Sequence, residues 1–229
     1  SMKDMETHFA PNTEIGAVLL REDRRDALVG SYRSLDELPT RARIGTASVR
    51  RTAILLNYRP DLQISLIRGN LNRRLDLLAA GDYDAIILAV AGIKRLGVDI
   101  DFTPIDAEIM PSAVAQGALA VQIAAPKTKR AIEVKRLVGD LTCPQALAEI
   151  TAERSLLAFL DGSCQTPISA SATLDNDGYL TLDGMILRPD GSESYRNQMR
   201  APIDQAAALG AALGSELLGL AGGRKFLAR

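Results

Sequence analysis

The chain has 229 residues, of which 47% are hydrophobic and 24% charged, a composition that suits one large folded domain or two smaller ones. Lys and Arg together number 27 against 28 Asp and Glu, so no overall charge indicates nucleic acid or an anionic membrane as a partner. No apolar run approaches the ~20 residues of a membrane span, and "SMKDMETHFAP" at the start does not form a signal peptide. We therefore expect a cytoplasmic protein.

The first half of the chain alternates short apolar runs with helical patterns. Strands are predicted at residues 14–20, 43–48 and 62–70, and helices at residues 49–58 and 71–81. The segment "YDAIILAVAGI", residues 83–93, is a continuous apolar run, which predicts a strand covered on both faces of a sheet. This alternation of strands and helices indicates an α/β fold.

Beyond Leu141 the pattern changes, and we place a domain boundary there. A helix is predicted at residues 143–160, with one apolar face made of Leu147, Ile150, Leu156, Leu157 and Leu160. Three strands at 167–174, 179–187 and 193–201, joined by the turns "DNDG" and "RPDGS", precede a last helix at 204–220. These elements predict a small α+β domain with a three-stranded antiparallel sheet.

The segment "AAPKTKRAIEVKRL", residues 124–137, is basic and could be taken for a nucleic-acid-binding patch. Its lysines and arginines fit better as the solvated face of a helix. We therefore predict no nucleic-acid partner.

Two cysteines, Cys143 and Cys164, are more consistent with two thiols than with a disulfide in a reducing compartment. Cys164 lies on a tight glycine turn between a predicted helix and a predicted strand, which suggests a thiol with a chemical role. His8 is the sole histidine, so no Ser-His-Asp triad and no histidine-rich metal site can form. A thiol without a histidine base is a poor hydrolase, but it can carry a covalently attached group.

Five arginines lie near predicted strand ends or in the helices that follow, where ligands bind in open α/β sheets: Arg50, Arg51, Arg68, Arg74 and Arg95. Guanidinium groups bind carboxylates or phosphates through paired hydrogen bonds, and Thr46 and Ser48 add neutral donors. The ligand predicted from this pattern is polyanionic. The alternative is that each arginine is surface charge or pairs with a neighbour such as Asp76 or Asp82. The pattern does not distinguish carboxylate from phosphate, or catalysis from binding.

Five motifs follow one another along the chain: "SMKD" at 1–4, "GTASVRR" at 45–51, "RPDLQISLIRGNLNRRL" at 59–75, "GDYDAIILAVAGIKRLG" at 81–97 and "DGSCQTPI" at 161–168. Together they resemble the porphobilinogen deaminase family, also called hydroxymethylbilane synthase, and they stand in the family's order. The resemblance extends over essentially the whole chain.

The resemblance implies a fold in which two α/β domains like those of periplasmic binding proteins flank a cleft and a third, α+β domain carries the cofactor. On this basis residues 1–20 are the remnant of domain 1 and residues 21–110 form α/β domain 2. Residues 111–140 return the chain to domain 1, and residues 141–229 form the α+β cofactor-carrying domain 3.

The resemblance also implies a transferase of tetrapyrrole (heme) biosynthesis, which joins four porphobilinogen molecules into hydroxymethylbilane and releases ammonia. In this family the cysteine of the "GxCQxPI" loop holds a dipyrromethane cofactor by a thioether, which assigns that role to Cys164. Asp4 matches the catalytic aspartate, which would bind pyrrole N–H groups and stabilise the cationic azafulvene formed as ammonia leaves. Cys143 matches no such motif and is interpreted as structural.

Each porphobilinogen brings acetate and propionate side chains, which accounts for the arginines. By resemblance the cofactor-binding residues, besides Cys164, are Lys3, Thr46, Ser48, Arg50, Arg51, Arg68 and Arg74. The substrate-binding residues are Arg68, Asn70, Arg74 and Arg95, and no metal is expected.

The chain departs from the family by lacking a substantial segment before "SMKD". We therefore expect Asp4 on a free end, without packed neighbours, and little or no activity. The segment "PSAVAQGALAVQIAAP", residues 111–126, would lack its partners, which predicts self-association of a family that is usually monomeric, or a rearranged segment. Ala115 and Gln122 also depart from the family's usual residues in this segment.

Two alternatives remain open from the residues. A non-catalytic anion receptor of the solute-binding type would share the cleft but would have no need of Cys164. A structural or interaction fragment would leave the arginines without a common target.

Overall fold

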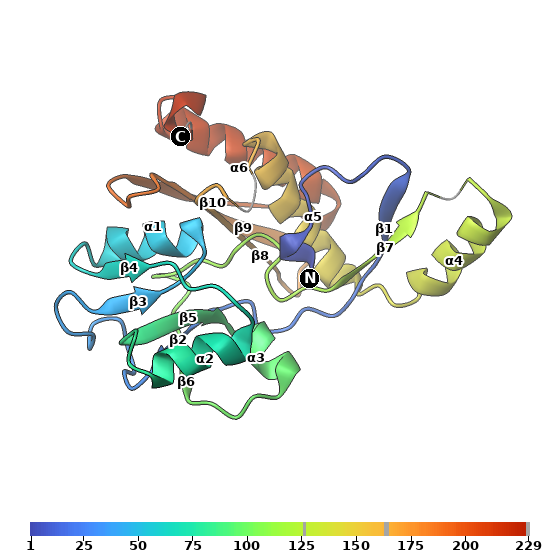
Figure 1. The fold of residues 1–229 in the computed structure, drawn as a ribbon. Coiled ribbons are helices and arrows are strands. Elements are labelled where there is room, and N and C mark those ends of the chain that lie inside the picture. Colours follow the sequence, from blue (N-terminus) through green and yellow to red (C-terminus); the bar gives the residue numbers. More distant parts are fainter. Residues whose placement is uncertain (126, 163–164, 228–229) are drawn as a thin grey trace.

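The computed structural model describes residues 1–125, 127–162 and 165–227. These residues form a five-stranded, a three-stranded and a two-stranded sheet. The first two pack against each other, because Met185 and Leu187 of the three-stranded sheet join a core cluster of the five-stranded sheet. The two-stranded sheet and helix α4 (Lys129–Gly139) extend away from both (Figure 1). The predicted combination of an α/β part with an α+β part is confirmed.

The five-stranded sheet has the order β4-β3-β5-β2-β6. Its strands are β2 (Asp26–Gly30), β3 (Arg43–Gly45), β4 (Gln63–Ser65), β5 (Ala85–Ala89) and β6 (Phe102–Pro104). Strand β3 runs parallel to β4 and β5, whereas β2 runs antiparallel to β5 and β6. Helix α1 (Val49–Tyr58) packs on one face, and α2 (Leu71–Ala79) with α3 (Val90–Leu96) packs on the other. The carboxyl ends of the parallel strands therefore meet near the start of α1.

The run at residues 83–93 is not one strand, as predicted, but strand β5 followed at once by helix α3. Within β5 the side chains alternate between the two core clusters, Ile86 and Leu88 on one face and Ile87 on the other, as a sheet covered on both faces requires. From Val90 the chain turns into a helix that ends at Gly97, whose φ of +59° is left-handed. Periodicity does not separate a buried strand from a buried helix in such a short apolar run.

The three-stranded sheet has the order β10-β9-β8 and is antiparallel throughout, as predicted. Its strands are β8 (Ile168–Leu174), β9 (Tyr179–Leu187) and β10 (Ser194–Pro202), and helices α5 (Pro144–Phe159) and α6 (Ala206–Leu220) pack against it. The two helices approach closely at Gly210, where a Cβ atom would lie 2.2 Å from the carbonyl oxygen of Ala152. The prediction that Leu147 belongs to the buried face of α5 is wrong, because this side chain is 42% exposed.

The two-stranded sheet pairs β1 (Thr13–Val18) antiparallel with β7 (Ala120–Ala124). Helix α4 packs on it, and within the described residues α4 has no buried side chain, with Ile132 and Leu137 each 56% exposed. The basic segment is therefore a solvated helix, as predicted. No helix within the described residues is long and apolar enough to cross a membrane.

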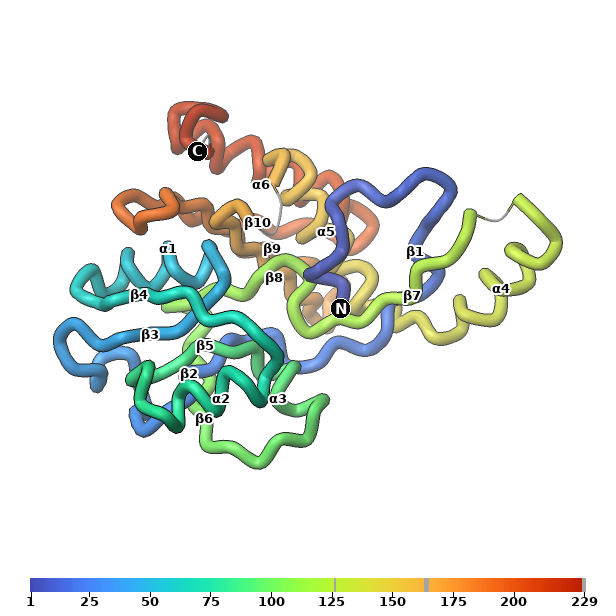
Figure 2. The backbone as a smooth tube through the Cα atoms, in the orientation of Figure 1, coloured from blue at the N-terminus to red at the C-terminus, as the bar shows by residue number. Residues whose placement is uncertain are grey.

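The N-terminal residues do not form the free end predicted from the sequence. Met2 is buried within the core cluster that includes α5, and its backbone N–H donates to the carbonyl oxygen of Ala118 at 3.0 Å. Figure 2 shows this turn lying against the segment that runs into β7. Val114, Ala115 and Ala118 of that segment are buried in the same cluster, so the expectation that they lack partners is also wrong. Self-association stays a prediction.

Candidate functional site

A cavity of about 700 Å³ lies where several segments distant in the sequence meet. Lys3 and Asp4 line it from the N-terminal turn, and Ser48, Arg50 and Arg51 line it from the start of α1. The wall also includes Arg74 of α2, Gln116 of the return segment, Arg154 of α5, and Gly162, Gln165 and Thr166 of the "DGSCQTPI" motif. Cys164 lies outside the described residues, but residues on both sides of it line the cavity. The structure thus joins motifs 1–4, 45–51 and 161–168 in one place.

The start of α1 is organised by two hydroxyl side chains. Ser48 is the N-cap, and its side chain accepts a hydrogen bond from the backbone N–H of Arg51 at 3.4 Å. Thr46 is buried, and its Oγ1 accepts from the backbone N–H of Ser48 at 3.2 Å. Ser48 therefore lines the cavity, whereas Thr46 supports the turn behind it.

Arg50 and Arg51 are both buried and share one carboxylate, Asp26 of β2. Asp26 Oδ2 accepts from Arg50 Nη2 at 2.5 Å, and Asp26 Oδ1 accepts from Arg51 Nη2 at 2.6 Å. Burial by itself raises the pKa of Asp26, but the charges and hydrogen bonds of the two guanidinium groups outweigh burial and hold it well below its ordinary value. The two arginines thus pair with an aspartate distant in sequence, and not with Asp76 or Asp82.

Sequence reasoning missed Asp26. The available signal was a carboxylate at the first position of a short apolar strand, "DALVG", where a buried charge requires a partner. That signal does not name the partner, because Arg50 and Arg51 follow more than twenty residues later.

Lys3 is connected to the same carboxylate through Gln116. Lys3 Nζ donates to Gln116 Oε1 at 3.2 Å, and Gln116 Nε2 donates to Asp26 Oδ1 at 2.8 Å. Burial first, and then the positive charge of Arg51, lower the pKa of Lys3 to about 8. Asp4, the next residue, is exposed at the cavity. A cationic amine and an exposed carboxylate, on consecutive residues, therefore line the same cavity.

Two further arginines line the cavity, and sequence reasoning named only the first. Arg74 is half-buried and donates from Nε to the carbonyl oxygen of Gly69 at 3.0 Å; burial, and then the charge of Arg51, lower its pKa. Arg154 donates from Nη2 to the carbonyl oxygens of Glu6 and Thr7, both at 2.8 Å, and its guanidinium lies over the ring of Phe9. Arg154 therefore holds the chain that leaves the "SMKD" motif against α5.

Four of the predicted site residues do not line this cavity. Thr46 lies behind it, Arg68 is exposed, and Asn70 caps α2 by accepting from the backbone N–H of Arg73 at 3.0 Å. Arg95 donates to the carbonyl oxygen of Gly117 at 2.7 Å and lines a second hollow. The binding roles of these residues stay predictions.

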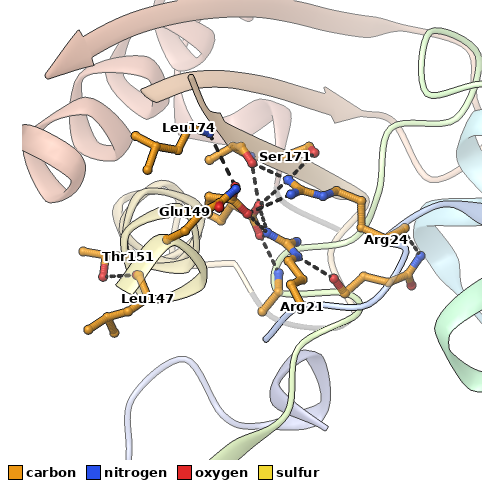
Figure 3. A network of polar contacts seen from close by, with 12 residues as sticks. Arg21, Arg24, Leu147, Glu149, Thr151, Ser171 and Leu174 are labelled. Atoms are coloured by element: carbon orange, nitrogen blue, oxygen red, sulfur yellow. Dashed lines mark hydrogen bonds and ion pairs between the residues drawn. The ribbon is translucent and has the colours of Figure 1, made fainter. Parts of the chain in front are cut away.

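A second buried ion cluster, also missed, lies between the chain after β1 and helix α5 (Figure 3). Arg21 makes a bidentate pair with Glu153 at 2.6 and 3.0 Å, and Arg24 pairs with Glu149 at 2.7 Å. The backbone N–H groups of Ala115 and Ala172 also donate to Glu153, at 2.7 and 2.9 Å. This cluster ties the return segment, α5 and β8 together, and its charges balance.

Comparison with known proteins identifies the family. Residues 1–132 match the family model "Porphobilinogen deaminase, dipyromethane cofactor binding domain", and residues 147–219 match "Porphobilinogen deaminase, C-terminal domain". The porphobilinogen deaminase of Nitrobacter hamburgensis is 42% identical over 99% of this chain and 71% of that protein. The porphobilinogen deaminase of Desulforamulus reducens is 40% identical over 99% of this chain and 72% of that protein.

Similar solved structures include an L-arginine-bound amino acid ABC transporter substrate-binding protein of Streptococcus pneumoniae, 16% identical over 54% of this chain and 52% of that chain, with a TM-score of 0.34. A TRAP periplasmic solute binding protein of Desulfovibrio salexigens is 14% identical over 59% of this chain and 40% of that chain, also with a TM-score of 0.34. Similarity this low does not distinguish a receptor from an enzyme. The family models cover both parts of the fold, and they favour the enzyme over the receptor alternative. The chain belongs to the porphobilinogen deaminase family of transferases, the hydroxymethylbilane synthases, whose cofactor is dipyrromethane.

Proposed function

We propose that this chain carries dipyrromethane on Cys164 and binds the carboxylates of the cofactor and of porphobilinogen in the cavity. The observation that supports this most directly is a charge imbalance at the cavity wall. Within the described residues, Arg50 and Arg51 pair with one carboxylate, that of Asp26, so one buried positive charge is left over. Lys3 adds a further cation beside them. A buried excess of positive charge is stabilised by an anionic ligand.

The residues present fit dipyrromethane, because its acidic side chains match this donor set. Lys3, Ser48, Arg50, Arg51 and Arg74 would hold those carboxylates from the side of α1 and α2. When bound, the cofactor supplies the pyrrole carbon to which the first porphobilinogen unit is joined. Gly162, Gln165 and Thr166, which flank Cys164 in the sequence between α5 and β8, line the same cavity as these donors.

Asp4 is the proposed catalytic residue. Its carboxylate lies at the cavity beside Lys3, where it can accept hydrogen bonds from pyrrole N–H groups and stabilise positive charge that develops on a bound ring. The buried Met2 and the hydrogen bond from Lys3 to Gln116 hold the N-terminal turn in this position. Arg68, Asn70 and Arg95, which lie outside the cavity wall, are proposed as contacts to substrate.

We also propose the domain division at residues 21–110 and 141–229. The five-stranded sheet and its helices fall in the first range, and the three-stranded sheet with α5 and α6 falls in the second. The cavity lies between the two, with residues 1–20 and 111–140 contributing the N-terminal turn and the return segment. In this division Cys164 belongs to the range 141–229, whereas Arg50, Arg51 and Arg74 belong to the range 21–110.

The test is an intact mass of the purified chain after incubation with porphobilinogen. We expect an added mass of two linked pyrrole units in the wild type and in Cys143→Ala, and its loss in Cys164→Ala. Cys143→Ala is the matched control because Cys143 is the other thiol, half-buried at the start of α5. The same added mass on Cys164→Ala would contradict the attachment site, and the bare mass in all three proteins would contradict cofactor assembly by this chain.

Turnover is measured on the same samples as consumption of porphobilinogen. Little or no turnover is expected, and a rate comparable with that of the Nitrobacter hamburgensis relative would show that expectation to be wrong. Asp4→Asn, in a sample that carries the cofactor mass, is expected to abolish any turnover that the wild type shows. Retained turnover in that variant would remove Asp4 from the catalytic role.

A further inference from the structure

Asp26 lies at the centre of the hydrogen bonds that organise the cavity, although it does not line the cavity itself. Its two carboxylate oxygens take different partners. Oδ2 accepts from Arg50, whereas Oδ1 accepts from Nε and Nη2 of Arg51, at 3.1 and 2.6 Å, and from Gln116 Nε2 at 2.8 Å. The residue is completely buried, so solvent offers it no alternative partner. These neighbours therefore determine the orientation of the Asp26 carboxylate, and the carboxylate in turn determines the orientation of their side chains.

Each arginine is held at a second point. Arg50 Nη1 donates to the carbonyl oxygen of Pro111 at 2.6 Å, and Arg51 Nη1 donates to the carbonyl oxygen of Ile87 at 2.9 Å. A planar guanidinium bonded on two sides has a fixed plane as well as a fixed position. Gln116 is held likewise, since its Nε2 also donates to the carbonyl oxygen of Arg24 at 2.7 Å while its Oε1 accepts from Lys3. One carboxylate thus connects three cations of the cavity wall.

We propose that Asp26 is a positioning residue for carboxylate recognition, acting on Arg50 and Arg51 directly and on Lys3 through Gln116. The proposal rests on the proposed function in that the ligand is taken to be a carboxylate. A single carboxylate suits this role, because it orients the two guanidinium groups while neutralising only one of them. A second one would fix them equally well but would cancel the charge that attracts the ligand.

The charges that face Lys3 are those of Arg51, Asp26, Asp4 and Arg50. Of these, Asp26 and Asp4 favour the protonated amine, and the two arginines oppose it. Removing the negative charge of Asp26 is therefore expected to make Lys3 titrate below its wild-type value. Because the loss of this charge acts on Lys3 through space by itself, the link through Gln116 is tested separately, in a variant that keeps Asp26 charged.

The experiment compares Asp26→Asn with the wild type and with Glu149→Gln. Glu149 is an equally buried carboxylate that pairs with Arg21 and Arg24, away from the cavity, so it controls for the loss of a buried ion pair. Two quantities are measured in each folded protein. One is the pKa of Lys3, from the pH dependence of competitive acetylation followed by peptide mass spectrometry. The other is the dissociation constant of porphobilinogen, from calorimetry with Cys164→Ala as the common background, so that no covalent step contributes.

In Asp26→Asn we expect the pKa of Lys3 to fall and porphobilinogen to bind at least about tenfold more weakly, whereas both stay at their starting values in Glu149→Gln. Phenylglyoxal should modify Arg50 and Arg51 faster in Asp26→Asn, because the guanidinium groups have lost their partner. A folded Asp26→Asn protein with unchanged Lys3 titration, arginine labelling and affinity would overturn the proposal.

Gln116→Met is the second variant, and it decides the question if Asp26→Asn does not fold. It keeps the pairs of Asp26 with Arg50 and Arg51 but removes the link to Lys3. The pKa of Lys3 should fall and affinity should weaken about threefold, with arginine labelling unchanged. Unchanged Lys3 titration in this variant would overturn the link. If porphobilinogen does not bind the starting protein, the proposed function fails, and the Lys3 titration and arginine labelling still decide the positioning role.

Discussion

The two buried ion clusters contain the same number of arginines and differ in the number of carboxylates. Arg21 and Arg24 face Glu149 and Glu153, and these carboxylates also accept backbone N–H groups. Among the residues that the structure describes, Arg50 and Arg51 pair with one carboxylate, that of Asp26. The first cluster is complete and joins segments of the fold, whereas the second is one carboxylate short and borders the cavity. The count of partners is therefore the reason why we assign a stabilising role to the first cluster and propose ligand binding at the second.

The largest expected effect is on stability at the balanced cluster. Glu153→Ala leaves Arg21 buried without its bidentate partner and two backbone N–H groups without an acceptor, which should lower the free energy of unfolding by about 3 to 5 kcal/mol. Urea denaturation followed by circular dichroism measures the loss, and porphobilinogen affinity under folding conditions should stay within about twofold. A variant that unfolds normally but binds poorly would reverse the roles assigned to the two clusters.

The next effect is on ligand binding at the unbalanced cluster. Arg51→Met removes a guanidinium that borders the cavity but leaves Asp26 paired with Arg50 and Gln116. Porphobilinogen affinity should fall about 30-fold, equivalent to about 2 kcal/mol, with a smaller loss in the free energy of unfolding. Calorimetry and urea denaturation on the same preparation give both numbers. A stability loss larger than the binding loss would show that the charge excess does not serve a ligand.

The smallest expected effect is on the acid dependence of stability. The folded-state pKa of Asp26 is held below the unfolded value of about 3.9. Its contribution to stability is therefore complete above the unfolded value, and it is lost progressively as the pH falls from there through the folded-state pKa. Between pH 5 and pH 3 the free energy of unfolding of the wild type should therefore decrease by about 1 kcal/mol more than that of Asp26→Asn. Urea denaturation at several pH values measures both slopes. Equal slopes in the two proteins would mean that Asp26 does not titrate with folding.

The elements of the fold were largely predictable, and the failures have local causes. Helix α1 and strand β9 have the predicted limits, because strong periodicity and an N-cap or a glycine turn mark their ends. The sequence predicts helix α3 as a continuation of strand β5. An apolar run that is buried on every side lacks the polar positions that distinguish the period of a helix from that of a strand. Strand β2, which supplies Asp26, was not predicted at all, since five residues give too short a pattern.

The residues of the candidate site also fall into those that the sequence predicted and those that it did not. Motifs along the chain named Lys3, Asp4, Ser48, Arg50, Arg51 and Arg74, and the structure brings all six to one cavity. Cys164, the predicted attachment residue, lies outside the described residues. The sequence did not point to Asp26, Gln116 or Arg154, because each acts on residues that are distant in sequence. Asp26 and Arg154 also lie outside the five motifs and the return segment that resemble the family.

By itself, the sequence determined the family, the fold class and six of the side chains that line the cavity, because family motifs and periodic apolar patterns are local in the chain. Only the tertiary structure decided which charges are buried together: that Arg50 and Arg51 share Asp26, that Gln116 joins Lys3 to it, and that Arg21 has a full complement of partners. The physical reason is that the energy of a buried charge depends on every group within a few ångströms. Those groups come from β2, α1, α5 and the return segment, whose proximity exists only in the folded chain.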